Sequence, residues 1–119
     1  TYYSITQTQN QILAYLSQAE KETYDFEKNI INDIYLKKGD VLFLQKKYEE
    51  SLFYALKVYD FSKEKALSFL DPGEIYLAWK KNEQAEEFWK KASQDHSIKE
   101  ELKEHLLQKL KVLENIKEK

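Results

Sequence analysis

The chain of 119 residues contains no cysteine, no arginine, one proline and two glycines. The absence of cysteine excludes disulfides, thiolate metal sites and cysteine nucleophiles together, and it is compatible with a reducing cytoplasm. So few prolines and glycines leave little room for turns, which favours long helices over many short strands. No window approaches 18 consecutive apolar residues, so we expect no membrane-spanning segment.

The absence of arginine bears on nucleic-acid binding. All 19 basic residues are lysine, they face 21 acidic residues, and the formal net charge is −2. The chain therefore lacks the planar guanidinium that pairs with phosphates and guanine edges, and it has no basic field. We expect no nucleic-acid binding by this segment. A cytoplasmic location fits this composition, although the chain begins with Thr1 rather than methionine, which leaves open a preceding signal, anchor or partner domain.

Catalytic patterns are also missing from the sequence. It has no glycine-rich phosphate loop, no nucleophile elbow and no zinc spacing. His96 and His105 are nine residues apart, which is not the spacing of a metal pair on one helix face. The carboxylate pairs Glu49-Glu50 and Glu86-Glu87 lie near lysines on polar faces. We therefore expect neither an enzyme nor a bound metal or cofactor.

One sequence pattern occurs twice between Tyr35 and Ala92, with an offset of 34 residues. The equivalent pairs are Leu36 and Leu70, Gly39 and Gly73, Lys46-Lys47 and Lys80-Lys81, Glu49 and Glu83, and Lys57 and Lys91. A fixed period in this range is typical of stacked repeats. The hydrophobic content of 42% is sufficient for a folded chain, and the length suits a single domain over residues 1–119.

The apolar spacing predicts an all-α fold. The expected helices run from about Ser4 or Thr6 to Ile30 and over residues 32–45, 49–61, 63–70, 72–80, 83–93 and 98–116. Ser4 to Gln7 and Ser97 to Glu100 have the form of capping boxes and should open the first and last helices. Asp71-Pro72 could start a helix or kink one, and we expect two helical pieces that meet at Asp71. Residues 1–31 could be a degenerate repeat or a helix that covers the end of the stack of repeats, and we favour the covering helix.

These residues resemble the tetratricopeptide repeat, a 34-residue hairpin of two antiparallel helices. The second copy matches at Phe69, Gly73, Tyr76, Ala85, Trp89 and Ala92, and the first, less closely, at Tyr35, Gly39, Leu42, Ser51 and Val58. The first copy departs from the motif at Lys38 and Ala55, and the second at Pro72. The resemblance covers about residues 32–97 and implies a short right-handed solenoid of stacked hairpins. Its parts would be an N-terminal helix or degenerate repeat (1–31), two repeats (32–65 and 66–97) and a C-terminal capping helix (98–119).

The same resemblance implies a concave groove lined by the first helix of each hairpin, where a protein or peptide binds. Carried onto this chain, the groove residues would be Asp33, Leu36, Asp40, Phe43, Leu67, Leu70, Glu74 and Leu77. Asp40 and Glu74 take the main polar places, so a clamp for a ligand carboxylate is not expected. Charge complementarity favours an apolar or basic segment as the partner.

Two alternatives remain open. The apolar stripe Ile98, Leu102, Leu106, Leu110 and Leu113 could cap the stack, or it could mediate self-association in a structural or assembly role. The lysine-rich, tyrosine-rich composition also resembles the tetratricopeptide domains of peptide-sensing regulators of Gram-positive bacteria, which implies an excised regulatory domain.

Overall fold

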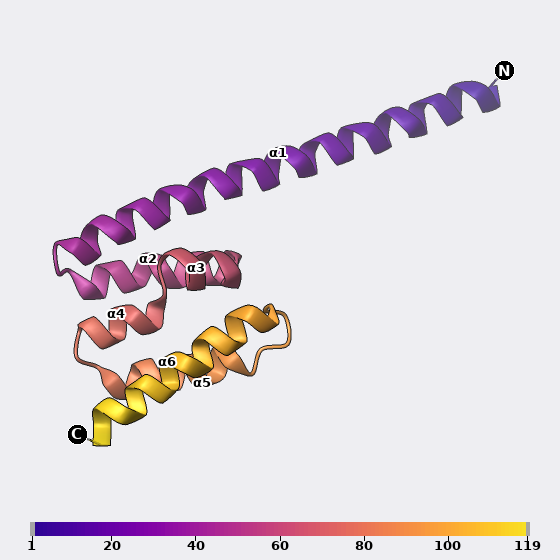
Figure 1. Ribbon diagram of the computed structural model, residues 1–119. Helices are drawn as coiled ribbons and strands as arrows, with labels where there is room; N and C mark the ends of the chain where they lie inside the picture. The colour runs from indigo at the N-terminus through magenta and orange to yellow at the C-terminus, as the bar shows by residue number, and fades with distance from the viewer. Residues whose placement is uncertain (1, 119) are drawn as a thin grey trace. The chain divides into compact units, whose positions relative to one another are not determined.

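The computed structural model describes the backbone of residues 2–118 and the side chains of residues 7–116. Within that range the regular structure is helical throughout, and the chain divides into two compact units, residues 1–33 and 34–119. The helices are α1 (Tyr2–Leu44), α2 (Tyr48–Phe61), α3 (Lys63–Phe69), α4 (Pro72–Ala78), α5 (Asn82–Ser93) and α6 (Glu100–Glu118) (Figure 1). The first unit contains only the N-terminal part of α1.

The two helices expected before and after residue 31 are a single helix, α1, which runs without a break from Tyr2 to Leu44. This stretch contains no proline, and the side chain of Asn32 remains within the helix, where its Nδ2 donates to the carbonyl of Lys28 at 2.8 Å. Residues 2–31 therefore form one helical segment with no turn that could make a hairpin. The capping box expected at Ser4 lies outside the described side chains.

In the second unit, successive helices pack as antiparallel pairs (Figure 1). The turn after α1 is repeated, bond by bond, in the turn after α4. Lys46 and Lys80 both adopt a left-handed backbone conformation, with φ values of 63° and 64°. The amide of Lys47 donates to the carbonyl of Leu42 at 2.8 Å, and the amide of Lys81 donates to the carbonyl of Tyr76 at the same distance. Each turn is a Schellman motif, so the backbone of these two turns repeats at the 34-residue spacing of the sequence.

Both glycines lie where two helices approach each other closely. A Cβ on Gly39 would overlap the side chain of Leu70, and a Cβ on Gly73 would overlap the indole of Trp89. The equivalent positions on the facing helices are all buried: Ser51, Ala55 and Val58 in α2, and Ala85, Trp89 and Ala92 in α5. The absence of a side chain at each glycine lets the paired helices lie close together.

The predicted interruption at Asp71 is confirmed. Helix α3 ends at Phe69 and α4 begins at Pro72, with Asp71 as the N-cap residue whose carboxylate accepts from the amide of Gly73 at 2.9 Å. Proline at the first helical position loses no hydrogen bond that the helix needs, whereas in a continuous helix it would cost about 3 kcal/mol.

Helix α6 begins at Glu100, two residues later than the sequence predicts. The hydroxyl of Ser97 donates to Asp95 Oδ1 at 2.7 Å, and the Ser97 amide donates to the same oxygen at 2.8 Å. Asp95 also pairs with Lys63 at the start of α3. This competing set of bonds holds Ser97 in the loop before the helix.

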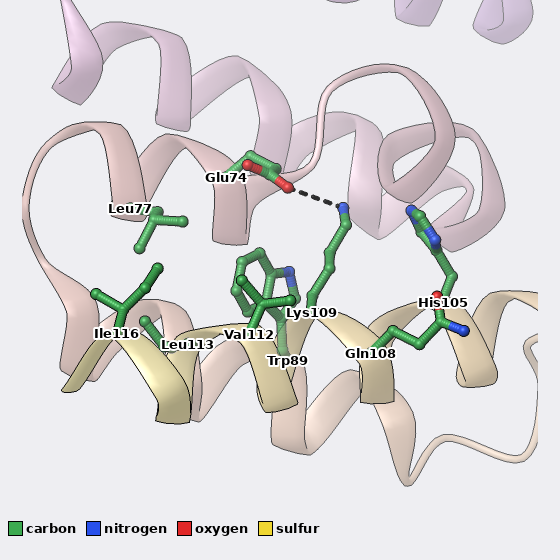
Figure 2. A pocket seen from close by; sticks show the side chains of 9 residues that line it. All are labelled: Glu74, Leu77, Trp89, His105, Gln108, Lys109, Val112, Leu113 and Ile116. Atoms are coloured by element: carbon green, nitrogen blue, oxygen red, sulfur yellow. Dashed lines mark ion pairs between the residues drawn. The ribbon is translucent and has the colours of Figure 1, made fainter. Parts of the chain in front are cut away.

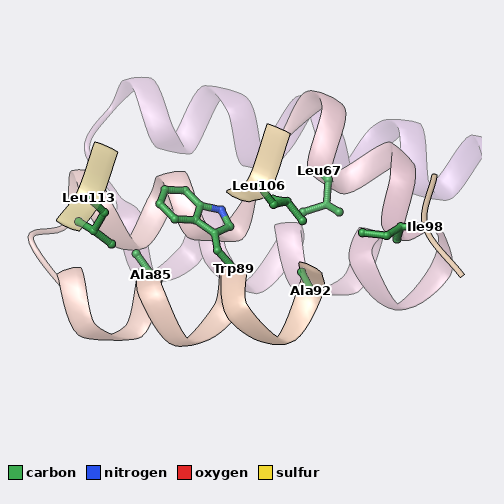
Figure 3. Close-up of a cluster of buried hydrophobic side chains, with 7 residues drawn as sticks. All are labelled: Leu67, Ala85, Trp89, Ala92, Ile98, Leu106 and Leu113. Carbon is green, nitrogen blue, oxygen red and sulfur yellow. The ribbon is translucent and has the colours of Figure 1, made fainter. Parts of the chain in front are cut away.

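Two clusters of buried side chains form the core of the second unit. One joins α3, α5 and α6 and is shown in Figure 3: Leu67, Ala85, Trp89, Ala92, Ile98, Leu106 and Leu113. The other joins α2 to the α3–α4 region: Leu52, Ala55, Leu70 and Ile75. The predicted stripe of the last helix lies in the first cluster, with Leu102 and Leu110 packed against it, so this stripe is covered within the chain.

Candidate binding site

A cavity of about 260 Å³ lies between α4, α5 and α6. Figure 2 shows its lining, which comprises Glu74, Leu77, Trp89, His105, Gln108, Lys109, Val112, Leu113 and Ile116. One end is apolar, because Leu77 of α4 faces Val112, Leu113 and Ile116 of α6 across it (Figure 2). The other end is polar, where Lys109 reaches towards Glu74.

The polar end is built on a buried network around Asp71. The Asp71 carboxylate accepts from the Trp89 indole at 3.0 and 3.2 Å and from Lys109 Nζ at 2.8 Å, in addition to the Gly73 amide. Lys109 Nζ also lies 3.1 Å from a carboxylate oxygen of Glu74 and 5.5 Å from the centre of the Trp89 ring. The network links α4, α5 and α6 through charge-assisted hydrogen bonds.

The charge state of Lys109 follows from two opposed effects. Burial disfavours the charged form and by itself lowers the pKa of Lys109, but the hydrogen bonds and charges of Asp71 and Glu74 outweigh it and leave the pKa raised. Lys109 therefore stays protonated at neutral pH and is committed to the two carboxylates. The side chain of Glu74 remains about half exposed, so its other oxygen can meet a ligand.

A second cavity, of about 230 Å³, adjoins the first. Its lining comprises Asp40, Phe43, Leu67, Ser68, Phe69, Leu70, Asp71, Glu74, Ile75, His105 and Lys109. Glu74, His105 and Lys109 line both cavities. We call the surface formed by the two cavities the groove. Its lining comes from the C-terminal part of α1, from the α3–α4 region, from Trp89 of α5 and from α6.

Six of the eight residues predicted for the groove line one of these cavities. The second cavity has Asp40, Phe43, Leu67, Leu70 and Glu74, and the first has Glu74 and Leu77. Leu67 and Leu70 are buried, so they form the floor rather than the rim. Leu36 packs against the cluster of Leu52 and Ala55, and Asp33 belongs to the first unit.

The sequence prediction missed the wall supplied by α6. Lys109, Val112 and Ile116 follow one another at steps of three and four, beside the stripe that was identified as the cap. This second row of residues was the signal available in the sequence. Asp71 was predicted as a helix cap but not as the centre of a charged network, because its partner Lys109 is 38 residues away.

The described residues contain neither a metal-binding cluster nor a membrane-spanning helix. Across residues 7–116, no group of three or more histidine, aspartate or glutamate side chains is placed to hold a metal ion. None of the helices, as far as the structure describes them, is both long enough and apolar enough to cross a bilayer. No protein-family model, curated protein or solved structure matches this chain.

Proposed function

We propose that this chain is a non-enzymatic interaction module with a tetratricopeptide-like arrangement, and that it binds a protein or peptide segment in the groove. The observation that carries the proposal is the meeting of two cavities at Glu74, His105 and Lys109. Two adjoining hollows on successive helices suit an extended segment, with one side chain in each.

The segment that fits carries both apolar and basic side chains. Leu77, Val112 and Ile116 offer an apolar pocket, and Val112 and Ile116 are more than half exposed to solvent. The charged groups of the lining are three carboxylates, those of Asp40, Asp71 and Glu74, against the single ammonium of Lys109. This acidic excess favours lysine or arginine on the partner.

The tetratricopeptide-like arrangement is supported by the repeat geometry. The equivalent turns at Lys46 and Lys80 and the equivalent glycines at helix contacts recur at 34 residues. In such an array the first helix of each pair would line the same wall, and these are the helices that carry Asp40 and Glu74.

The test is a selection from a random peptide library with the full chain as bait, followed by fluorescence anisotropy with the enriched peptides. The expected peptides carry basic and apolar residues, and their affinity falls at least tenfold in the double variant Asp40→Lys, Glu74→Gln. The matched control is Glu49→Lys, Glu83→Gln, which changes the net charge equally at exposed carboxylates outside the groove.

The control variant should bind within about twofold of the unchanged chain. Because the contacts are partly ionic, binding should also weaken as salt rises from 0.05 to about 0.5 M. Enrichment of acidic peptides, or an equal loss of affinity in both double variants, would refute the groove as the binding site.

Self-association through the last helix finds less support. Ile98, Leu106 and Leu113 are buried against α3 and α5, so a dimer seam would need α6 to leave its own core.

A further inference from the structure

A third cavity, of about 460 Å³, shares no lining residue with the groove. Four of its residues belong to α1 and two to α2: Lys37, Lys38, Val41, Leu42, Glu50 and Tyr54. We call this surface the end face of the α1–α2 pair. All six residues lie in the second unit.

Every residue of the end face has a counterpart 34 positions later, on α4, α5 or the cap between α3 and α4. The counterparts are Asp71, Pro72, Ile75, Tyr76, Gln84 and Phe88, in the same order. The exposure differs in three of these six pairs. Val41 is 53% exposed whereas Ile75 is 1% exposed, and Lys37 and Lys38 are exposed whereas Asp71 and Pro72 are buried. The positions of Lys37, Lys38 and Val41 are thus open in the first pair and covered in the second, whereas Tyr76, Gln84 and Phe88 line a cavity just as their counterparts do.

Helix α2 covers Ile75 and Phe88 of the second pair, whereas the partners of the buried Asp71 carboxylate, Trp89 and Lys109, come from α5 and α6. Ile75 lies in a buried cluster with Leu52 and Ala55, and the ring of Phe88 meets the ring of Tyr59 edge to face at 5.1 Å between centres. These three α2 residues are spaced by three and four, so they form one face of that helix. A helix of the same kind would cover Val41 and Tyr54 on the end face.

We propose that the end face docks an amphipathic helix of a partner protein, in the place that α2 takes over α4 and α5. The partner helix carries small and apolar residues on one face and acidic residues beside them. The acidic requirement follows from the substitution of Lys37 and Lys38 for Asp71 and Pro72, which leaves two ammonium groups against the one carboxylate of Glu50. Lys38 Nζ lies 5.8 Å from the centre of the Tyr54 ring, so one of these charges lies beside the apolar part of the end face.

The α2 helix of a second copy cannot supply this partner. Its Leu52 and Ala55 are already buried against α4, and Tyr59 is already packed on Phe88. The inference is independent of the groove, because it concerns other residues and a ligand of the opposite charge.

The test uses two helix-constrained, fluorescent peptides with the sequence of residues 48–61. Both keep the residues equivalent to Leu52, Ala55 and Tyr59; in one the flanking polar positions are glutamate, and in the other they are lysine. With the full chain, we expect the acidic peptide to bind at least tenfold more tightly than the basic one in an anisotropy titration. Constraint is needed because an isolated helix of 14 residues is marginal in water.

Four variants test whether the peptides bind at the end face. Val41→Asp should weaken the acidic peptide at least tenfold, and Lys37→Glu with Lys38→Glu should reverse the preference between the peptides. The matched control Lys80→Glu with Lys111→Glu makes the same charge change elsewhere and should leave the preference unchanged. The groove variant Asp40→Lys, Glu74→Gln should bind the acidic peptide as the unchanged chain does, which separates this inference from the proposed function.

Melting curves by circular dichroism establish that each variant is folded, and Val41 is exposed enough for aspartate to be tolerated there. Equal binding of the two peptides, no binding of either, or a preference that survives the charge reversal would overturn the proposal. A dimer of the chain in sedimentation that Val41→Asp dissolves would overturn it too, since the end face would then be occupied by a second copy.

Discussion

At the scale of single residues, Lys46 and Lys80 stand in a conformation that their side chains do not favour. A left-handed backbone costs a residue with a Cβ roughly 1 kcal/mol or more, and glycine is the usual choice at this point of a Schellman motif. Both lysines follow the end of a helix and keep φ near 63°. The turn geometry is therefore imposed by the two helices that it joins.

Lys46→Gly and Lys80→Gly should each raise the free energy of unfolding by about 1 kcal/mol, because glycine removes the strain of the left-handed backbone. Lys47→Gly is the matched control, since Lys47 has a φ of −90° and gains nothing from glycine. Urea titration followed by circular dichroism measures all three. A loss of stability in Lys46→Gly equal to that of Lys47→Gly would contradict this account of the turn.

The two glycines give a second contrast between equivalent positions. Alanine in a helix is favoured over glycine by about 1 kcal/mol. A methyl on Gly73 would overlap the rigid indole of Trp89, whereas a methyl on Gly39 meets the end of the flexible Leu70 side chain. Overpacking costs about 1–3 kcal/mol, so Gly73→Ala should destabilise by about 2 kcal/mol and Gly39→Ala should be close to neutral in the same titration.

At the scale of helices, the Asp71–Lys109 pair fixes α6 to the start of α4. Removing one partner of a buried ion pair leaves an uncompensated charge, at a cost of about 3 kcal/mol. Lys109→Met should therefore destabilise the chain by roughly that amount. Adding Asp71→Asn should restore most of the loss, because asparagine is neutral and still caps α4. A double variant no more stable than Lys109→Met alone would show that the charge of Asp71 is not the cause.

The loop before α6 should respond to acid. The hydrogen bond from Lys63 and those from the hydroxyl and amide of Ser97 hold the pKa of Asp95 well below its usual value of 3.8. A lowered pKa contributes stability above the unfolded value, and this contribution is lost as pH falls through the folded one. Asp95→Asn should thus be less stable than the unchanged chain at pH 7, and the difference should shrink steadily below pH 4. Melting temperatures of both chains between pH 2 and pH 7 measure this convergence.

Helix boundaries were predictable where a local rule decided them and failed where a distant contact did. Asp71-Pro72 marked a break by its own cap chemistry, and the structure confirms that break. The sequence around Ser97 predicted an equally good N-cap. In the structure, however, the Ser97 hydroxyl donates to Asp95, which also forms an ion pair with Lys63. The apolar spacing of residues 1–45 could not show that the two predicted helices are one. A period of 3.6 residues is the same in one long helix as in two consecutive helices.

At the scale of the whole chain, only part of the lining of the candidate site could be predicted from the sequence. The repeat placed Asp40, Phe43, Glu74 and Leu77 on helices that line the groove. The wall from α6 lies outside the repeat, and the row Lys109, Val112 and Ile116 does not by itself show which helices α6 packs against. Its place depends on the shared core around Trp89 and Leu106, a contact between elements far apart in sequence.

The division into two units leads to the last prediction. Both buried clusters lie between residues 52 and 113, so the second unit has a core of its own. The first unit is a single helical segment in which Ile12, Leu16 and Phe26 are at least half exposed. Taken by itself, a single helical segment is held by its own hydrogen bonds and propensity, and its helicity changes gradually with temperature.

A fragment of residues 34–119 should therefore unfold cooperatively in urea, with a single transition by both circular dichroism and tryptophan fluorescence, because Trp79 and Trp89 both lie in it. A peptide of residues 1–33 should lose its helicity gradually on heating, without a cooperative step. A cooperative transition in the short peptide would mean that it associates with itself, and a non-cooperative transition in the long fragment would mean that its core needs the first unit.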